Sequence, residues 1–345
     1  MRMTATALPV LDERRRGTRF VELSCRSILN TPESTGMGFW SANPYVGCEF
    51  GCTYCYARYA HRYVAERARD GGTLTHDEYE DLTRPHGLES FEHRIFVKRR
   101  RSVEEALGRD LRRLRGRTKR DGRQSLIIGS GTDPYQPAER VYQITRTILE
   151  RLRQERGIRI GVITKSHLVC RDAVLLQQLA RSHAVSVYIS LISLDAAVTT
   201  RFEARSPRPH VRLRALERLS SAGIRAGLIV APVLPGLTDS VKQIDRLMRA
   251  ARDAGAAFVL PIPLRLYPDA RHRVLPIVQQ WNSELADRYR QHFTAGWNVP
   301  DTYATAMRAR FRSIAARYGI PDTSTEDDPT PGEVPASPAQ LSLWR

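Results

Sequence analysis

The stretch that organises this chain reads Asn43-Pro44-Tyr45-Val46-Gly47-Cys48-Glu49-Phe50-Gly51-Cys52-Thr53-Tyr54-Cys55-Tyr56-Ala57-Arg58. It holds three of the five cysteines, Cys48, Cys52 and Cys55, within eight positions. Gly47 and Gly51 give the backbone the freedom to wrap three thiolates around one centre. Thiolates are soft ligands that select zinc or iron-sulfur clusters. The stretch therefore predicts a metal centre.

The cysteine spacing alone leaves two kinds of metal centre open. A structural zinc site needs a fourth ligand, and His61, six residues after Cys55, is the nearest candidate. An iron-sulfur cube held by three cysteines instead leaves one iron without a protein ligand. The zinc interpretation corresponds to a zinc-stabilised nucleic-acid-binding protein without catalysis.

Length and composition indicate one large domain with decorated ends. The chain has 345 residues, 41% of them hydrophobic, and α/β barrels of this size form a single unit. No apolar run approaches the roughly 18 residues needed to cross a bilayer, and the first 19 residues contain no apolar signal region. Cys25 and Cys170 are too few for a disulfide framework. We therefore predict a cytoplasmic protein without a membrane segment.

The formal net charge of +17 raises the question of a polyanionic partner. Only four of the 54 basic residues are lysine, a bias that a GC-rich genome explains as well as phosphate binding does. The segment from Lys98 to Arg120 nevertheless has eleven basic residues against three acidic ones. Such a run is either the solvated face of a helix or a patch that binds nucleic acid.

From residue 125 onward, apolar runs alternate with helical segments. Strands are expected at 125–128, 158–163, 185–189, 224–230 and 256–260, and helices at about 139–155, 171–182, 208–222 and 238–254. The stretch Trp40–Val46 adds a sixth strand before the cysteines. This alternation predicts βα repeats and a parallel sheet, either a barrel or a doubly wound sheet. Two further helices are expected near 274–294 and 301–318.

Polar residues follow several of the predicted strands, where the βα loops of a barrel open. Thr132, Lys165 and Ser190 are examples, each just after a strand or at its end. Taken singly, such residues could only shape turns or cap helices. Together they offer hydroxyls and a cation at one rim, as an amino-acid carboxylate and a ribose require. Lysine is so rare here that Lys165 is the most informative of them, because a point cation suits a carboxylate.

The cysteine spacing, with Tyr54 before the last cysteine, resembles the signature loop of radical S-adenosylmethionine (SAM) enzymes. Three further motifs resemble the spore photoproduct lyase-related group of that family: Thr132-Asp133-Pro134-Tyr135-Gln136-Pro137-x-Glu139, Ile163-Thr164-Lys165-Ser166 with Arg171-Asp172, and Ala231-Pro232-x2-Pro235-Gly236. The resemblance spans about residues 30–300. It implies an α/β fold, a partial (βα)6 TIM-type barrel of parallel strands with extra N- and C-terminal segments.

The resemblance also implies the cofactors and the residues that bind them. Cys48, Cys52 and Cys55 would hold a 4Fe-4S cluster whose open iron binds SAM. The SAM contacts carried over are Tyr54, near the adenine, and Thr132, Lys165 and Ser190.

The implied activity is reductive cleavage of SAM to a 5′-deoxyadenosyl radical, which abstracts hydrogen from a substrate. A flavodoxin- or ferredoxin-type electron donor is therefore expected. Photoproduct lyases carry a hydrogen-returning cysteine after the second strand, whereas this chain has Ser130 there. We therefore expect an unidentified substrate, with lyase-like repair of nucleic acid as the alternative.

The domain limits expected from sequence are a mobile basic arm over 1–20 and a core over 21–300. The core contains an insertion at about 70–120. A C-terminal helix over 301–321 precedes a disordered tail over 322–345, which is rich in Pro, Ser, Thr and acidic residues.

Overall fold

The structure, a computed structural model, describes residues 10–13, 17–70, 75–83, 90–116, 124–294 and 296–321. The predictions for most of the N-terminal arm, for the end of the basic run at 117–120 and for the tail after 321 lie outside the described residues. The domain limits as a whole stay predictions.

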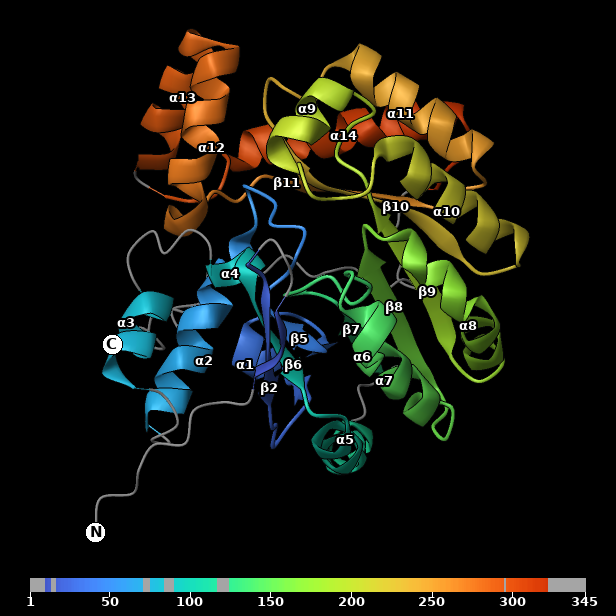
Figure 1. The fold of residues 1–345 in the computed structure, drawn as a ribbon. Helices are drawn as coiled ribbons and strands as arrows, with labels where there is room; N and C mark the ends of the chain where they lie inside the picture. Colours follow the sequence, from blue (N-terminus) through green and yellow to red (C-terminus); the bar gives the residue numbers. More distant parts are fainter. Residues whose placement is uncertain are drawn as a thin grey trace.

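The main sheet has seven strands, of which six are parallel (Figure 1). Across the sheet the strands are β3 (Leu29–Asn30), β4 (Trp40–Ala42), β7 (Gln124–Ile128), β8 (Ile158–Thr164), β9 (Ala184–Ser190), β10 (Ala226–Val233) and β11 (Val259–Pro263). Only β3 pairs antiparallel, with β4. The parallel strands follow one another in space in the order of the chain, whereas a doubly wound sheet would reverse at a switch point. The partial barrel is therefore confirmed, and the doubly wound alternative is excluded.

Helices cover the outer face of this sheet, as βα repeats require (Figure 1). They are α5 (Arg100–Arg115), α6 (Glu139–Tyr142), α7 (Ile144–Leu152), η2 (His167–Asp172), α8 (Ala173–Ala180), α10 (Pro209–Ser221), α11 (Val241–Asp253) and α14 (Asp301–Arg317). Side chains alternate along each strand, so Ile160 and Val162 of β8 lie in the core beneath the helices. Met307 and Phe311 of α14 belong to the same core. The C-terminal helix thus completes the helical layer beside α11 and β11.

A second sheet supports the cysteine loop from the other side. Its strands, in order, are β1 (Val10–Glu13), β2 (Arg19–Leu23), β6 (Arg94–Lys98) and β5 (Tyr45–Val46), with the small helices α1 (Pro32–Thr35), α2 (Tyr59–Asp70), α3 (His76–Thr83) and α4 (Ser90–His93) elsewhere in this N-terminal part. Strand β6 comes from the expected insertion and pairs with both β2 and β5. Helix α5, also from that insertion, packs into the main core through Leu107 and Leu111. The insertion therefore contributes a strand to the second sheet and a helix to the main core.

A helical hairpin covers the cysteine loop. Its helices are α12 (Pro268–Trp281) and α13 (Ser283–Thr294), which stand at the upper left in Figure 1. Val274, Val278 and Tyr289 of the hairpin share one apolar cluster with Cys48 and Cys52. This packing removes the loop from water on that side.

None of the described helices is both long and apolar enough to cross a bilayer. The cytoplasmic location stays a prediction.

Candidate functional site

The three cysteines lie in the loop between β5 and η1 (Tyr56–Arg58). Cys48 and Cys52 are 8% and 7% exposed, Cys55 is partly buried, and all are free thiols. Burial raises the pKa of Cys48 well above its usual value, and the charges of Asp133, Cys52 and Cys55 raise it further. The three thiols therefore lie near enough to one another for their charges to interact. A cationic centre that binds thiolates would relieve their repulsion.

His61 does not join the cysteines. Its ring packs against Phe91 and Phe96, at centroid distances of 5.4 and 5.5 Å, and burial lowers its pKa to about 3. Among the described residues, no three His, Cys, Asp or Glu side chains are placed to hold one metal ion. In an iron-sulfur cube each cysteine ligates a different iron, so the thiols need not meet at a single ion. The loop thus fits a cluster and lacks the fourth ligand of the zinc alternative.

Gly47 fixes the start of the loop. Its φ is +89°, and a Cβ here would lie 2.8 Å from the carbonyl oxygens of Phe91 and Arg94, so only glycine fits. Its own carbonyl accepts hydrogen bonds from the Thr132 hydroxyl at 2.7 Å and from the Gln136 amide at 3.2 Å. The turn after β7 therefore holds the cysteine loop in place.

Ion pairs fix the other end of the loop. Arg58 donates from Nη2 to the Cys52 carbonyl at 3.1 Å, and its Nη1 lies 2.7 Å from Glu92 Oε2. Arg273 of α12 binds the second oxygen of Glu92, also at 2.7 Å. The loop is thus clamped between the second sheet and the helical hairpin.

Glu203 brings together two of the four side chains predicted to bind SAM. The Tyr54 hydroxyl donates to its Oε1, and Lys165 Nζ lies 3.8 Å from the same oxygen. Arg212 binds the other oxygen at 2.6 Å and donates to the Ser190 carbonyl at 2.9 Å. Tyr54 and Lys165, far apart in sequence, thus meet at one buried carboxylate, and Ser190 lies next to it through the bond of its backbone carbonyl to Arg212.

Electrostatic interactions keep Lys165 charged, although it is the least tightly bound residue of this group. Burial alone would lower the pKa of Lys165, but the neighbouring Cys52 and Glu203 raise it above its usual value. Burial would raise the pKa of Glu203, but Arg212 and Lys165 lower it. The Lys165 side chain is 16% exposed, and its 3.8 Å separation from Glu203 is longer than a normal hydrogen bond. The charged ammonium of Lys165 therefore lies beside the cysteine loop, and its contact with Glu203 is weak.

Thr132 lies apart from this group, because its buried hydroxyl is committed to the cysteine loop. Its neighbour Asp133 accepts from the Thr164 hydroxyl at 2.6 Å and from the Lys165 backbone at 2.7 Å. Asp133 thus ties the loop after β7 to the end of β8 and fixes the backbone that carries Lys165.

Sequence reasoning missed Glu203, Arg212 and Glu92, and it quoted Gln136 only within the motif that follows β7. Glu203 follows α9 (Ala196–Phe202), a helix absent from the sequence prediction. No pattern in the sequence marks the three charged residues as buried.

Three aromatic rings line the rim beside the loop. Tyr56 lies 6.2 Å from Tyr267, which stacks on Trp297 at 5.4 Å with an interplanar angle of 11°. The Tyr56 hydroxyl donates to the carbonyl of Ser130, in the turn after β7. The rings therefore lie at the carboxyl ends of the strands.

Comparisons with known proteins show the family of the chain. The family model described as the radical SAM superfamily matches residues 42–248. The uncharacterized protein Rv2578c of Mycobacterium tuberculosis is 30% identical over 332 residues, which cover 95% of this chain and 89% of that protein. The uncharacterized protein ORF301 of Acidianus two-tailed virus is 28% identical over 221 residues, covering 63% of this chain and 64% of that protein.

Solved structures show the same fold. A mutant of spore photoproduct lyase with bound AdoMet and dinucleoside spore photoproduct has a TM-score of 0.59 at 14% identity, covering 88% of this chain and 80% of that chain. Another mutant of that lyase reaches a TM-score of 0.60 with the same coverage. The family model covers more than half of the sequence, and it includes all three loop cysteines. The chain belongs to the radical SAM superfamily, and it is an enzyme of that family.

Proposed function

We propose that Cys48, Cys52 and Cys55 hold a 4Fe-4S cluster and that the rim beside them binds SAM. The observation that supports this most strongly is the proximity of three free thiols to one another and to the charged Lys165 ammonium. A structural metal site would have no use for a loosely held cation at its edge. A cofactor that carries an amino-acid carboxylate would.

The SAM contacts proposed are Tyr54, Thr132, Lys165 and Ser190. Lys165 would neutralise the SAM carboxylate, while Glu203 would remain paired with Arg212. Tyr54 is held by its hydroxyl, so its ring is oriented for contact with the adenine. Thr132 would act through the cysteine loop, since its hydroxyl already binds the carbonyl of Gly47.

When bound, the cluster supplies one electron that cleaves SAM to methionine and a 5′-deoxyadenosyl radical, which takes hydrogen from a substrate. The chain's own residues would bind SAM, orient it and exclude water from the site. The hairpin α12–α13 packs over the loop, and the ion pairs of Glu92 hold the loop against it. This shielding favours a radical reaction by keeping water out.

Anaerobic reconstitution with iron and sulfide tests this proposal. We expect about four irons per chain and formation of 5′-deoxyadenosine from SAM and dithionite. Cys52→Ala should lose both, whereas Cys25→Ala, a matched change outside the loop, should keep both. Stoichiometric zinc in place of iron, or equal loss in the two variants, would contradict the proposal.

A second candidate function, radical chemistry on a nucleic acid, is favoured by one observation, the stacked rings of Tyr267 and Trp297 with Tyr56 tilted beside them at the rim. Aromatic side chains bind unpaired bases by stacking, which contributes about 1–3 kcal/mol per base. Trp297→Ala should therefore weaken binding of a single-stranded oligonucleotide about tenfold in fluorescence anisotropy at low salt. Absence of binding by the unaltered protein to single- and double-stranded DNA and RNA would exclude this candidate.

A further inference from the structure

An unpaired cationic surface lies on the segment that runs from α9 to the start of α10. Arg201, Arg205 and Arg208 are all exposed there, and we call these three residues the α9–α10 cationic surface. None of them forms an ion pair with another residue that the structure describes. Between Ala196 and Leu216 the one acidic residue is Glu203, which is buried against Arg212, and the exposed Asp195 and Glu217 lie just outside the two ends. The three arginines therefore form a positive surface whose nearest acidic residues along the chain lie at the ends of the segment.

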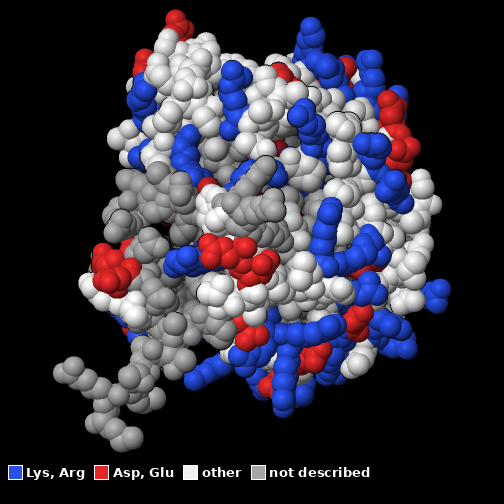
Figure 2. All heavy atoms as spheres, in the orientation of Figure 1, with Lys and Arg blue, Asp and Glu red and all other residues white. Residues whose placement is uncertain are grey.

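The basic helix α5 offers the opposite case. Arg101 pairs with Glu105 at 3.1 Å, and Arg115 pairs with Glu155 at 3.4 Å. Figure 2 shows basic and acidic side chains interleaved along the lower edge, where α5 lies in Figure 1. Five of the eight basic residues that the structure describes in this basic run form ion pairs, whereas none of the three arginines of the α9–α10 cationic surface does so with a described residue.

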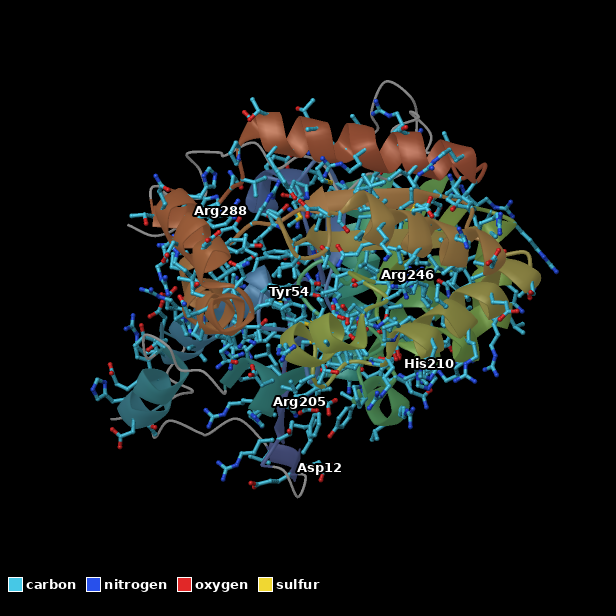
Figure 3. All side chains as sticks on the ribbon, turned by 90° about the horizontal axis from the view of Figure 1, so that it is seen from above. Asp12, Tyr54, Arg205, His210, Arg246 and Arg288 are labelled. Atoms are coloured by element: carbon cyan, nitrogen blue, oxygen red, sulfur yellow. The ribbon has the colours of Figure 1, made fainter. Side chains whose placement is uncertain are left out.

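The inner side of the α9–α10 segment touches the cysteine loop. The Thr53 backbone donates to the Phe202 carbonyl at 3.0 Å, and the Cys52 sulfur lies 3.7 Å from the Ser206 hydroxyl. Figure 3 shows Arg205 and His210 toward one side of the molecule, with Tyr54 deeper inside. One layer of residues therefore separates the cationic surface from a predicted cluster ligand.

The outer side of this segment has a cavity and an exposed tryptophan beside it. A cavity of about 250 Å³ is lined by residues that include Arg208, His210 and Leu213. Beside it, Trp281 of α12 is 37% exposed, with the Arg201 guanidinium 4.8 Å from its ring centroid. Arginine and tryptophan are both enriched where proteins bind one another.

We propose that the α9–α10 cationic surface docks an acidic one-electron donor protein. The inference rests on the proposed function, because the cluster is the acceptor. In the docked complex the donor loses one electron and the cluster gains it; that electron then breaks the bond between sulfur and C5′ of SAM. Electron transfer falls steeply with distance, and Ser206 places this surface next to Cys52. Charge complementarity steers such short-lived, small-area encounters.

Reduced flavodoxin and dithionite, compared on the reconstituted enzyme, test this docking surface. Arg205→Glu/Arg208→Glu should lower flavodoxin-driven formation of 5′-deoxyadenosine about tenfold at low salt and leave dithionite-driven formation unchanged. The matched control Arg101→Glu/Arg109→Glu on α5 makes the same change in net charge and should leave both rates unchanged. The charge-conserving Arg205→Lys/Arg208→Lys should retain the flavodoxin rate.

Salt and nucleic acid supply the remaining readouts. For the unaltered enzyme the flavodoxin rate should fall as salt is added, since salt screens the attraction, and the Arg205→Glu/Arg208→Glu rate should depend on salt far less. An unchanged flavodoxin rate in that variant overturns the docking inference, and so does a loss of oligonucleotide binding without a loss of flavodoxin rate. Absence of dithionite-driven cleavage in the unaltered enzyme would instead overturn the proposed function.

Discussion

Glu139 and Glu203 are both fully buried at the carboxyl end of the barrel, and each accepts a hydrogen bond from a tyrosine of the cysteine stretch. Glu139 binds Tyr45 and also the backbone N–H groups of Thr145 and Arg146, at 2.9 and 3.1 Å. Arg171 adds an ion pair at 3.0 Å. Glu139 is thus bound by fixed backbone N–H groups and by Arg171, which also pairs with Asp172. These contacts leave no loosely held partner among the described residues of the Glu139 network.

Glu203 has no comparable set of backbone donors in its described surroundings. Arg212 binds it tightly, while Lys165 remains at 3.8 Å. The pKa values separate the two carboxyls as well: burial raises the pKa of Glu139, whereas Arg212 and Lys165 outweigh burial and lower that of Glu203. The Glu139 network thus holds the cysteine loop through fixed bonds, whereas the Glu203 network leaves Lys165 at 3.8 Å from its partner, as the proposed SAM site requires.

Replacing each carboxylate by an amide tests this contrast most strongly. Glu203→Gln leaves Arg212 buried without its charge partner and should lower the free energy of unfolding by about 3 kcal/mol. Glu139→Gln should cost only about 1 kcal/mol, because its fold already favours the neutral form and the amide oxygen keeps its backbone donors. Urea unfolding followed by circular dichroism measures both. Equal losses of stability in the two variants would contradict the proposed difference between the two networks.

Removing Lys165 should affect chemistry rather than folding. Lys165→Met leaves Glu203 paired with Arg212, so the free energy of unfolding should stay within about 0.5 kcal/mol. SAM cleavage with dithionite should fall about 100-fold, equivalent to about 2.7 kcal/mol, because the SAM carboxylate loses its cation. A variant with normal cleavage would remove Lys165 from the proposed SAM site.

Removing Arg171 should give the reverse pattern. Arg171→Met takes an ion pair from both Glu139 and Asp172 and should lower the free energy of unfolding by about 2 kcal/mol. Once reconstituted and normalised to bound iron, this variant should cleave SAM at the rate of the unaltered enzyme. A large loss of rate per cluster would show that the Glu139 network is not purely structural.

The smallest expected effect is a difference between the two glutamates in how acid changes the stability of the protein. Glu203 has a lowered pKa in the fold, so its charge stabilises the protein at neutral pH, and this stability is lost as the pH falls below its ordinary value of 4.5. Glu139 has a raised pKa, so its protonation favours the folded state as the pH falls toward 4.5, at higher pH than the loss at Glu203. For the iron-free chain we expect Glu203→Gln to weaken the loss of stability below pH 4.5 by about 1 kcal/mol, and Glu139→Gln to remove the gain in stability that protonation of Glu139 gives above pH 4.5. Opposite signs in thermal melts would contradict the assignment.

The sequence predicted the parts of this protein that repeat or cluster locally. The strands at 158–163 and 185–189 and the helix at 208–222 lie within one or two residues of β8, β9 and α10, because alternating apolar residues mark them. Cys48, Cys52 and Cys55 were visible because short spacing is itself the signal.

The sequence did not predict what depends on long-range contacts. Glu203 meets Tyr54 across 149 positions and Lys165 from another strand, and no local pattern encodes such a meeting. The basic run of α5 was visible in the sequence but its ion pairs were not, because Glu155, one of its partners, lies far from it in the chain. The insertion had no helical or strand pattern before Arg94, although its residue Phe91 binds Cys48 through the backbone at 2.9 Å.

The central claim is that the cysteine loop and the Glu203 group together form a site for reductive SAM cleavage. The most direct measurement is the yield of 5′-deoxyadenosine from SAM and dithionite by anaerobically reconstituted enzyme, with bound iron determined on the same sample. The account predicts about four irons per chain and product that is lost in both Cys52→Ala and Lys165→Met, with iron lost only in the former. Iron-loaded enzyme that forms no 5′-deoxyadenosine would contradict it.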